Sequence, residues 1–189
     1  MSVLCDWQIK QRCEKHQMIW PYRPELLNPA SLDVVIGSQL MMEVADTPEL
    51  QRLDISDRTA EDPYLLLPGE FVLTETFETM NIPSDISAQF VLKSSRAREG
   101  YQHMLAGWAE GGFHGSKLTL EIQNARRHHP LPIYPNLKIG QMVFFEMSGG
   151  GPEQDYSVTG RYNNTTQVTP SKDDIFKMIS DSDVAPNKS

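Results

Sequence analysis

The chain contains 189 residues, of which 39% are apolar and 22% are charged, proportions typical of one globular domain. They exclude a disordered or fibrous protein. A net charge of −8, from 25 acidic and 17 basic side chains, opposes general binding to DNA or RNA.

The sequence has no segment approaching the ~20 consecutive apolar residues that a membrane-spanning helix needs. Its first residues lack the basic-then-apolar order of a secretion signal. We therefore expect a cytoplasmic protein without membrane contact. Cys5 and Cys13 fall in one predicted helix, so we expect packing residues in a reduced compartment rather than a disulfide.

The first predicted element is a helix over residues 7–16, capped by Asp6. From Pro21 onward, short runs rich in apolar and β-branched residues alternate with Gly and Pro. They predict strands at residues 32–36, 39–44, 64–67, 71–77, 86–92, 118–122, 131–134 and 141–147. Such a series is typical of a sandwich or barrel.

Beyond Pro152 the composition becomes polar, which predicts a mobile tail. Ser171, followed by Asp174, predicts a short helix that extends through Met178. We expect residues 181–189 to be frayed.

The sequence lacks the His-x-Glu and Cys-x-x-Cys patterns of zinc deaminases. It also lacks the glycine-rich phosphate loops of the common nucleotide-binding folds and the nucleophile elbow of serine hydrolases. The adjacent His128 and His129 precede Pro130 in a predicted turn, where solvent exposure is a simpler explanation than metal binding.

The densest polar cluster is Lys93-Ser94-Ser95-Arg96-Ala97-Arg98, directly after an apolar run. Three cations and two hydroxyls at a strand end suit phosphate oxygens, more so where a helix begins. The alternative is a solvated basic turn. Both interpretations stay open on this pattern.

Residues 117–124 alternate strictly between apolar and polar side chains. This pattern places Leu118, Leu120 and Ile122 on one face of a strand and Glu121 on the other. On an open sheet Glu121 is an ordinary surface carboxylate. Beneath a lid or a neighbouring subunit it is shielded from water and suited to proton transfer.

The segment from Ala106 to Gly115 is rich in glycine and contains one carboxylate, Glu110. Glycines allow a backbone to close on a ligand, although a wide connection between strands has the same composition. We expect Trp108 and Phe113 to anchor this loop.

Read in order, these segments resemble the dCTP deaminases of the dUTPase-like trimeric superfamily. The resemblance covers about 170 residues, an ordinary single-domain length. It rests on residues 4–6, 28–33, 67–71, 93–98, 106–124, 139–141, 161–162 and 169–171. It implies a mainly β fold, a distorted barrel or jelly roll with a short N-terminal helix and a polar tail. It also implies a homotrimer with nucleotide sites at subunit boundaries, and hydrolytic deamination of dCTP without zinc.

The resemblance also implies the roles of individual residues. Glu121 matches the general acid/base, Ser94 and Arg98 match the catalytic serine and arginine, and the main chain of Ala106 faces the base. The implied nucleotide-binding set is Lys93, Ser94, Ser95, Arg96, Ala97, Arg98, Glu110, Thr119, Leu120, Glu121, Gln141, Tyr156, Arg161 and Thr165. Mg²⁺ is expected on the triphosphate, with no metal ligands from the protein, and dTTP is expected as a feedback inhibitor.

Four positions depart from the family pattern. Glu110 stands where an aspartate holds the sugar, and Thr165 stands where a glutamine is usual. Leu105 replaces a common threonine, next to His103. One extra residue between Gly115 and Glu121 predicts a bulge or longer turn near Ser116.

The resemblance assigns residues 1–171 to one dCTP deaminase-like domain that includes a nucleotide-closing tail, and residues 172–189 to the C-terminal extension. Our main functional hypothesis is deamination of dCTP to dUTP and ammonia. One alternative is a dUTP diphosphatase, or a bifunctional enzyme forming dUMP, with Glu110 activating water. A second is a nucleotide-binding interaction protein without catalytic activity.

Overall fold

The structure is a computed structural model that describes residues 2–173. Its elements in chain order are β1 (Ser2–Val3), α1 (Asp6–His16), β2 (Ile19–Trp20), η1 (Pro24–Leu26), β3 (Leu27–Asn28), β4 (Ser31–Val44), β5 (Thr47–Asp54), β6 (Tyr64–Leu66), β7 (Phe71–Met80), β8 (Ile86–Leu92), α2 (Ser94–Glu99), β9 (Tyr101–His103), β10 (Trp108–Ala109), β11 (Ser116–Asn124), β12 (Leu131–Ile133), β13 (Lys138–Glu146) and α3 (Tyr156–Thr159).

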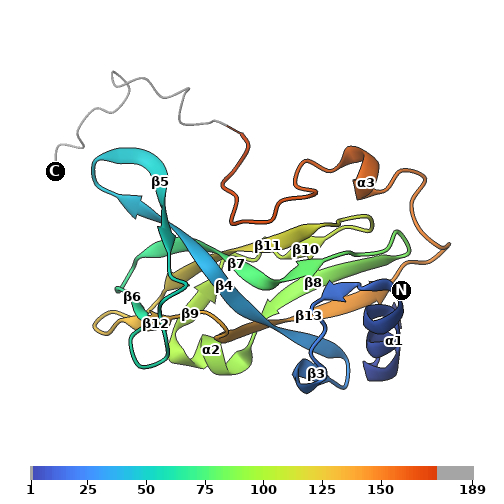
Figure 1. The fold of residues 1–189 in the computed structure, drawn as a ribbon, viewed down its shortest axis with the longest axis horizontal. Coiled ribbons are helices and arrows are strands. Elements are labelled where there is room, and N and C mark those ends of the chain that lie inside the picture. The colour runs from blue at the N-terminus through green and yellow to red at the C-terminus, as the bar shows by residue number, and fades with distance from the viewer. Residues whose placement is uncertain (1, 174–189) are drawn as a thin grey trace.

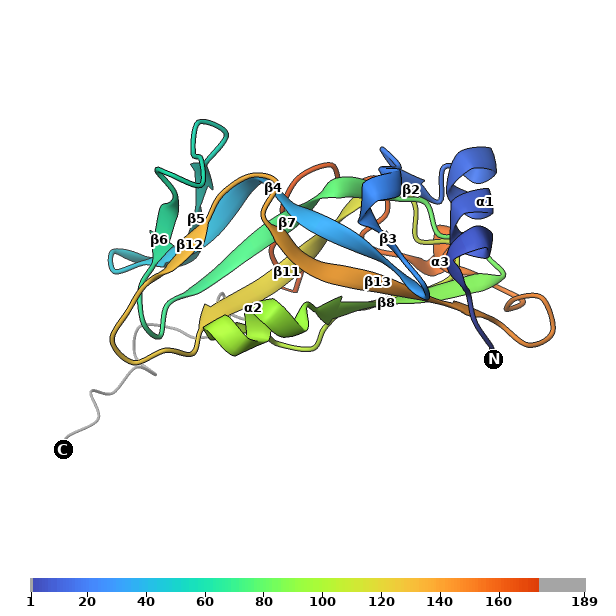
Figure 2. The same cartoon turned by 90° about the horizontal axis from the view of Figure 1, so that it is seen from below.

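A strongly curled antiparallel sheet organises the fold (Figures 1 and 2). Its main path runs β10-β8-β13-β4-β7-β11-β9, while β6 and β12 form a separate pair. Apolar side chains such as Ile36, Leu120 and Phe144 fill the interior of the curl and are fully buried. The predicted mainly β, distorted-barrel fold is confirmed.

Strand β4 differs from the prediction, which placed two strands on either side of Gly37. The strand continues through this glycine, pairing with β13 on one side and with β7 and β5 farther on. Its register with β7 shifts between Ile36 and Leu40. Gly37 bends the strand rather than ending it, and a Cβ there would lie 2.8 Å from Cγ of Glu75.

Helix α1 matches the predicted helix, but its cap does not. Asp6 is the first helical residue, and Cys5 occupies the N-cap position. Gln8 folds back so that its Oε1 accepts from the Cys5 backbone N–H at 3.1 Å, an arrangement that satisfies a donor at the helix start. Both cysteines are free thiols, and Cys13 is buried in the core.

Six strands were not predicted: β1, β2, β3, β5, β9 and β10. Five of them contain only two or three residues, too few to show a periodic pattern. The longer one, β5, carries Pro48 and several charged residues because it is the outer arm of an exposed hairpin with β4. Helix α2 begins at Ser94, inside the predicted polar cluster.

The extra residue before Glu121 produces the predicted bulge. The pairing of β11 with β7 shifts between Lys117 and Thr119. Thr76 Oγ1 of β7 accepts the Leu118 backbone N–H at 3.0 Å, so the irregular position keeps a hydrogen bond. The strand then continues in register through Glu121.

The predicted mobile tail is wrong for residues 156–173, which pack against the sheet; we call this segment the strap. Figure 1 shows it passing along one edge of β11. Val168 is fully buried against Met41 and Leu73, with Leu50 and Phe71 around them. The prediction failed because one apolar residue in a polar segment gives little local signal, although it anchors the segment.

Within the strap, Ser171 to Asp173 are not helical, and the rest of the helix predicted through Met178 lies outside the described residues. The expected frayed end and the assignment of residues 172–189 also lie mostly there. No helix between residues 2 and 173 is long and apolar enough to cross a bilayer.

Replacing Val168 by Ala should loosen the strap, because two buried methyl groups contribute about 2 kcal/mol. Amide hydrogen exchange around residues 162–169 should accelerate at least ~10-fold while exchange in β7 stays unchanged. Val158→Ala is the matched control, since Val158 is 74% exposed. Equal exchange in the two variants would contradict the anchoring role of Val168.

Candidate functional site

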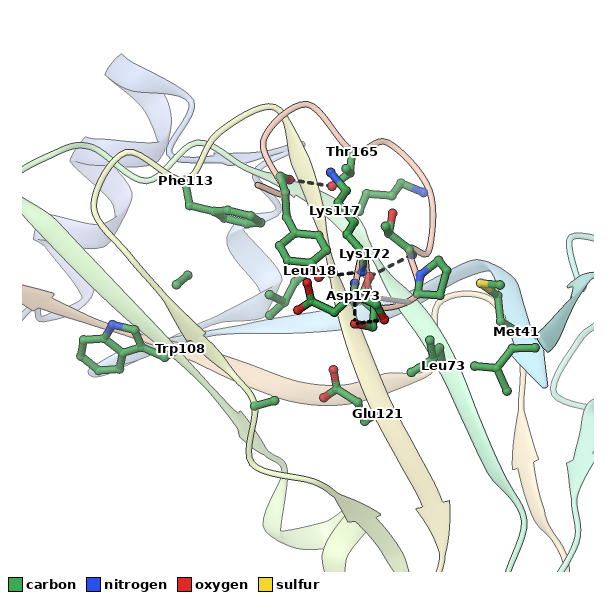
Figure 3. A pocket seen from close by; sticks show the side chains of 18 of the residues that line it. Met41, Leu73, Trp108, Phe113, Lys117, Leu118, Glu121, Thr165, Lys172 and Asp173 are labelled. Atoms are coloured by element: carbon green, nitrogen blue, oxygen red, sulfur yellow. Dashed lines mark hydrogen bonds between the residues drawn. The ribbon is translucent and has the colours of Figure 1, made fainter. Parts of the chain in front are cut away.

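A pocket of about 720 Å³ lies between β11, the loop before it, the β4–β5 hairpin and the strap. Figure 3 shows its lining side chains. Of the predicted site residues, it brings together Ala106, Glu110, Thr119, Glu121, Tyr156 and Thr165. These six come from three segments, the glycine-rich loop, β11 and the strap, and the fold makes them neighbours.

The alternation of β11 determines which side chains face this pocket. Leu120 and Ile122 point into the core and are fully buried, whereas Leu118, at the bulge and 7% exposed, packs in the core and also lines the pocket. Lys117, Thr119 and Glu121 point the other way and line the pocket. The predicted facing is confirmed, and Glu121 lies beneath neighbouring segments rather than in open solvent, with 24% of its side chain exposed.

His103 of β9 faces Glu121. The distance from His103 Nε2 to Glu121 Oε2 is 3.2 Å, and both atoms are shielded from solvent. They do not meet the directional criteria of a hydrogen bond. Catalytic hydrogen bonds are often poorly aligned before a ligand binds, so this contact is one that ligand binding can tighten.

A backbone contact determines which nitrogen of His103 carries the proton. The Leu105 N–H donates to His103 Nδ1 at 3.2 Å, so that nitrogen acts as an acceptor. In a neutral imidazole the other nitrogen is then the donor. The Nε2–H is therefore available to the Glu121 carboxylate, and the Phe90 ring, 4.7 Å away between centroids, holds the imidazole in place.

Lys117 forms an ion pair at the pocket wall. Its Nζ lies 2.6 Å from Oε1 of Glu75, a β7 carboxylate that is only 1% exposed. The other Glu75 oxygen is buried and has no hydrogen-bond partner. The ion pair therefore holds the Lys117 ammonium in the pocket wall, next to the bulge in β11.

The predicted polar cluster does not line this pocket. Ser94, Ser95, Ala97 and Arg98 lie on α2, and all four are exposed. Ala97 instead helps to line a second pocket of about 300 Å³ that also contains His103 and Leu105. In one chain the structure therefore separates Ser94 and Arg98 from Glu121.

Two cations of the cluster have protein partners. Lys93 Nζ lies 2.6 Å from the buried carboxylate of Asp33, and Asn28 also donates to Asp33. Arg96 pairs with Glu99 at 2.7 Å and lies over the ring of Tyr101. Lys93 therefore has a structural use, since the buried Asp33 carboxylate requires compensation, whereas the Glu99 partner of Arg96 is exposed.

Three further predicted residues lie outside the pocket. Gln141 of β13 accepts from Ser31 at 3.2 Å, and the Leu120 side chain is buried in the core. Arg161 is on the strap, where it pairs with Asp173 at 2.8 Å. That carboxylate raises the pKa of the Arg161 guanidinium, which is charged in any case.

The pocket is acidic. Its lining includes four carboxylates, on Glu49, Glu110, Glu121 and Asp173, against two ammonium groups, on Lys117 and Lys172. A free polyanion would meet net repulsion here, so its binding requires positive charge from another source. No group of three side chains suited to hold a metal ion occurs between residues 2 and 173. The zinc-free reaction implied by the resemblance stays a prediction.

His103, Glu75 and Lys117 are the residues at this site that sequence reasoning missed. The sequence signal for His103 was weak, because β9 contains only three residues. In addition, His103 pairs with Ile122 of β11, which is 19 positions later in the chain. Glu75 lies in β7, where the surrounding apolar residues predict a buried strand and give no sign of a functional carboxylate.

Comparison with known proteins places this geometry in a family. A model of the dCTP deaminase-like family matches residues 3–147. The chain belongs to the dCTP deaminase-like family. The family match covers β11, α2 and the glycine-rich loop, whereas the strap lies beyond it.

Two relatives align over nearly the full chain. The "dCTP deaminase, dUMP-forming" of Methanoregula boonei is 35% identical over 181 residues, covering 90% of this chain and 96% of the relative. The protein of the same description from Methanoculleus marisnigri is 33% identical over 178 residues, covering 90% and 94%.

The fold is also similar to a solved structure, the 2'-deoxycytidine 5'-triphosphate deaminase from Agrobacterium tumefaciens. The TM-score is 0.62 with 21% sequence identity over 77% of this chain. The match spans about half of the longer protein, 48% of its length. At this identity the likeness supports the distorted-barrel fold and nothing finer.

The geometry around Glu121 predicts that neutral His103 is the Nε2–H tautomer. Long-range ¹H–¹⁵N NMR of imidazole-labelled protein should show the tautomeric pattern with the proton on Nε2. His128, which is exposed, provides an internal comparison. A pattern with the proton on Nδ1 would contradict the contact from the Leu105 N–H.

Proposed function

We propose that this protein hydrolyses dCTP to dUMP, ammonia and pyrophosphate, using two water molecules. The observation that carries the proposal is the shielded Glu121 carboxylate facing His103 in a pocket that also contains Ala106 and Glu110. The two relatives above, both described as dUMP-forming, support this product. They favour the bifunctional alternative over our main hypothesis, in which dUTP is released.

In the deamination step, Glu121 takes a proton from the attacking water. It then returns protons to N3 and to the leaving amino group of cytosine, so that the C4–N bond breaks and ammonia departs. His103 Nε2–H orients the carboxylate, and main-chain groups near Ala106 and Thr119 hold the base and the water. The other carboxylate oxygen of Glu121, which does not face His103, stays available for proton transfer to and from the substrate.

In the second step, water attacks the phosphorus nearest the sugar and pyrophosphate leaves. Glu110, an exposed carboxylate of the same pocket, is the group we propose for positioning that water. Its side chain is one methylene longer than the aspartate of the family pattern and therefore reaches farther from the loop. A protein that binds the nucleotide without hydrolysis is the remaining alternative.

The charge balance of the pocket supports a contribution from a second copy. The triphosphate carries more negative charge than the two ammonium groups in the pocket of one chain can balance, while Ser94, Ser95 and Arg98 of α2 are exposed. Exposed apolar side chains near α2, including Leu105 at 89%, Met104 and Val91, could then be covered by the same contact. We propose a homotrimer in which α2 of one subunit completes the site of the next.

Mg²⁺ enters as part of the substrate. The described residues contain no three-ligand cluster that fits the ion, whereas triphosphate oxygens are suitable ligands. The Mg²⁺ complex also lowers the negative charge that the acidic pocket must accept. Feedback inhibition by dTTP stays a prediction, and Leu105, which stands where a threonine is common, is the position at which we expect it to be altered.

A product assay tests the reaction directly. Purified protein with dCTP and Mg²⁺ should release ammonia and pyrophosphate in equal amounts, with dUMP as the nucleotide product by chromatography. Ammonia without pyrophosphate would restore the dUTP-forming hypothesis. In a parallel reaction with dUTP, pyrophosphate without any ammonia from dCTP would indicate a dUTP diphosphatase, and binding with no product from either nucleotide would indicate a protein without catalytic activity.

A mixing experiment tests the shared site. Glu121→Gln and Arg98→Ala should each reduce deamination at least ~10²-fold, the usual scale for a lost acid/base or charge contact. Co-refolding equal amounts of the two inactive variants should restore up to about a quarter of the sites, because each site then draws its two residues from different chains.

Glu153→Gln, at an exposed position, serves as the single-variant control. If each variant is inactive and the mixture recovers nothing while sedimentation shows monomers, the shared-site model fails. Near-normal ammonia release by Glu121→Gln would instead remove Glu121 as the proton carrier.

A further inference from the structure

Lys117 has hydrogen-bonding capacity that its protein contacts do not use. An ammonium carries three N–H donors. Within residues 2–173, Glu75 is the one acceptor that Lys117 Nζ contacts, at 2.6 Å. The Lys117 side chain is 21% exposed and lines the pocket, so its remaining donors are available on the pocket side.

Glu75 holds this ammonium in a defined place. The carboxylate is 1% exposed, and a Cβ at Gly37 would lie 2.8 Å from both its Cγ and Oε1, so its position is sterically restricted. One of its oxygens has no other partner. The buried Glu75 carboxylate should hold the Lys117 ammonium tightly, because an unpaired buried charge strongly destabilises the folded protein.

The position of Lys117 along β11 indicates which part of a nucleotide it meets. Figure 3 shows Lys117 and Glu121 at separate places along the same strand. Four residues of strand correspond to roughly 13 Å. With cytosine at Glu121, a nucleotide lying along β11 extends its sugar and phosphates toward Lys117. The strap covers this end, since the Lys117 backbone N–H donates to the Thr165 carbonyl at 2.9 Å.

We propose that Lys117 is a phosphate-binding residue of the nucleotide site and that Glu75 is its positioning residue. The ammonium donates to a phosphate oxygen while Glu75 keeps it against the pocket wall. This inference rests on the proposed function, because the proposal that Glu121 acts on cytosine sets the position of the base. Lys117 lies directly before the bulge in β11, where the pairing with β7 shifts between Lys117 and Thr119.

The test removes the charge without leaving a buried carboxylate unpaired. The double variant Glu75→Met with Lys117→Met replaces the pair by apolar side chains of similar volume, an exchange that buried ion pairs often tolerate. We expect a near-normal melting temperature. The KM for dCTP should rise at least ~10-fold with kcat within about threefold of the wild-type value, as expected for a lost charge-assisted hydrogen bond.

A ligand without phosphate separates binding from a general disturbance of the pocket. Deoxycytidine, titrated to millimolar concentration by NMR, should bind the double variant and the wild type equally. Lys172→Met is the matched control, because Lys172 is the other cation lining the pocket but lies on the strap over the Tyr162 ring. Its KM for dCTP should change less than about threefold, as for an exposed charge.

Three results would overturn the assignment: an unchanged KM in the double variant, an equal loss for deoxycytidine and dCTP, or an equal effect of Lys172→Met. Each leaves the wild-type reaction intact and therefore leaves the proposed function in place. If wild-type protein neither binds nor hydrolyses dCTP, the proposed function fails first, and the role of Lys117 fails with it.

Discussion

The site depends on one strand, β11, being held between β7 and β9. On one side, Ile122 and Leu120 bury their side chains in the core, which prevents the strand from rotating or slipping by one residue. A slip would move Glu121 into the core. On the other side, the pairing of Ile122 with His103 brings the imidazole beside Glu121. Packing of the core and the placement of His103 beside Glu121 are therefore set by the same register.

The bulge within this strand is compatible with that register because its donor is satisfied. Thr76 Oγ1 accepts the Leu118 N–H at 3.0 Å and donates to the Glu78 carbonyl at 2.7 Å. Without such a partner, a buried N–H would carry the desolvation cost of an unmade hydrogen bond. The extra residue thus changes the pairing only between Lys117 and Thr119, and the Glu121 side chain still points toward the pocket.

The sequence alone predicted the facing of Glu121, because alternation is a local pattern. It left open whether that face met solvent or a lid, since the answer depends on Val168, 47 positions later in the chain. The resemblance also assigned Lys93 to phosphate, yet Lys93 Nζ lies 2.6 Å from Asp33, a partner 60 positions away. Contacts of this kind depend on strand pairing, which no local pattern encodes.

The strap lines the pocket and is hydrogen-bonded to β11, the strand that bears Glu121. Thr169 N–H donates to Thr119 Oγ1 at 3.2 Å, and the Lys117 N–H donates to the Thr165 carbonyl. Thr119 lies between Lys117 and Glu121 on the pocket-facing side of β11. Opening of the strap would therefore break hydrogen bonds to Lys117 and Thr119, which precede Glu121 on β11. The strap covers the pocket and restrains β11 through the same contacts, and in the proposed reaction this arrangement would exclude water and keep Glu121 in register.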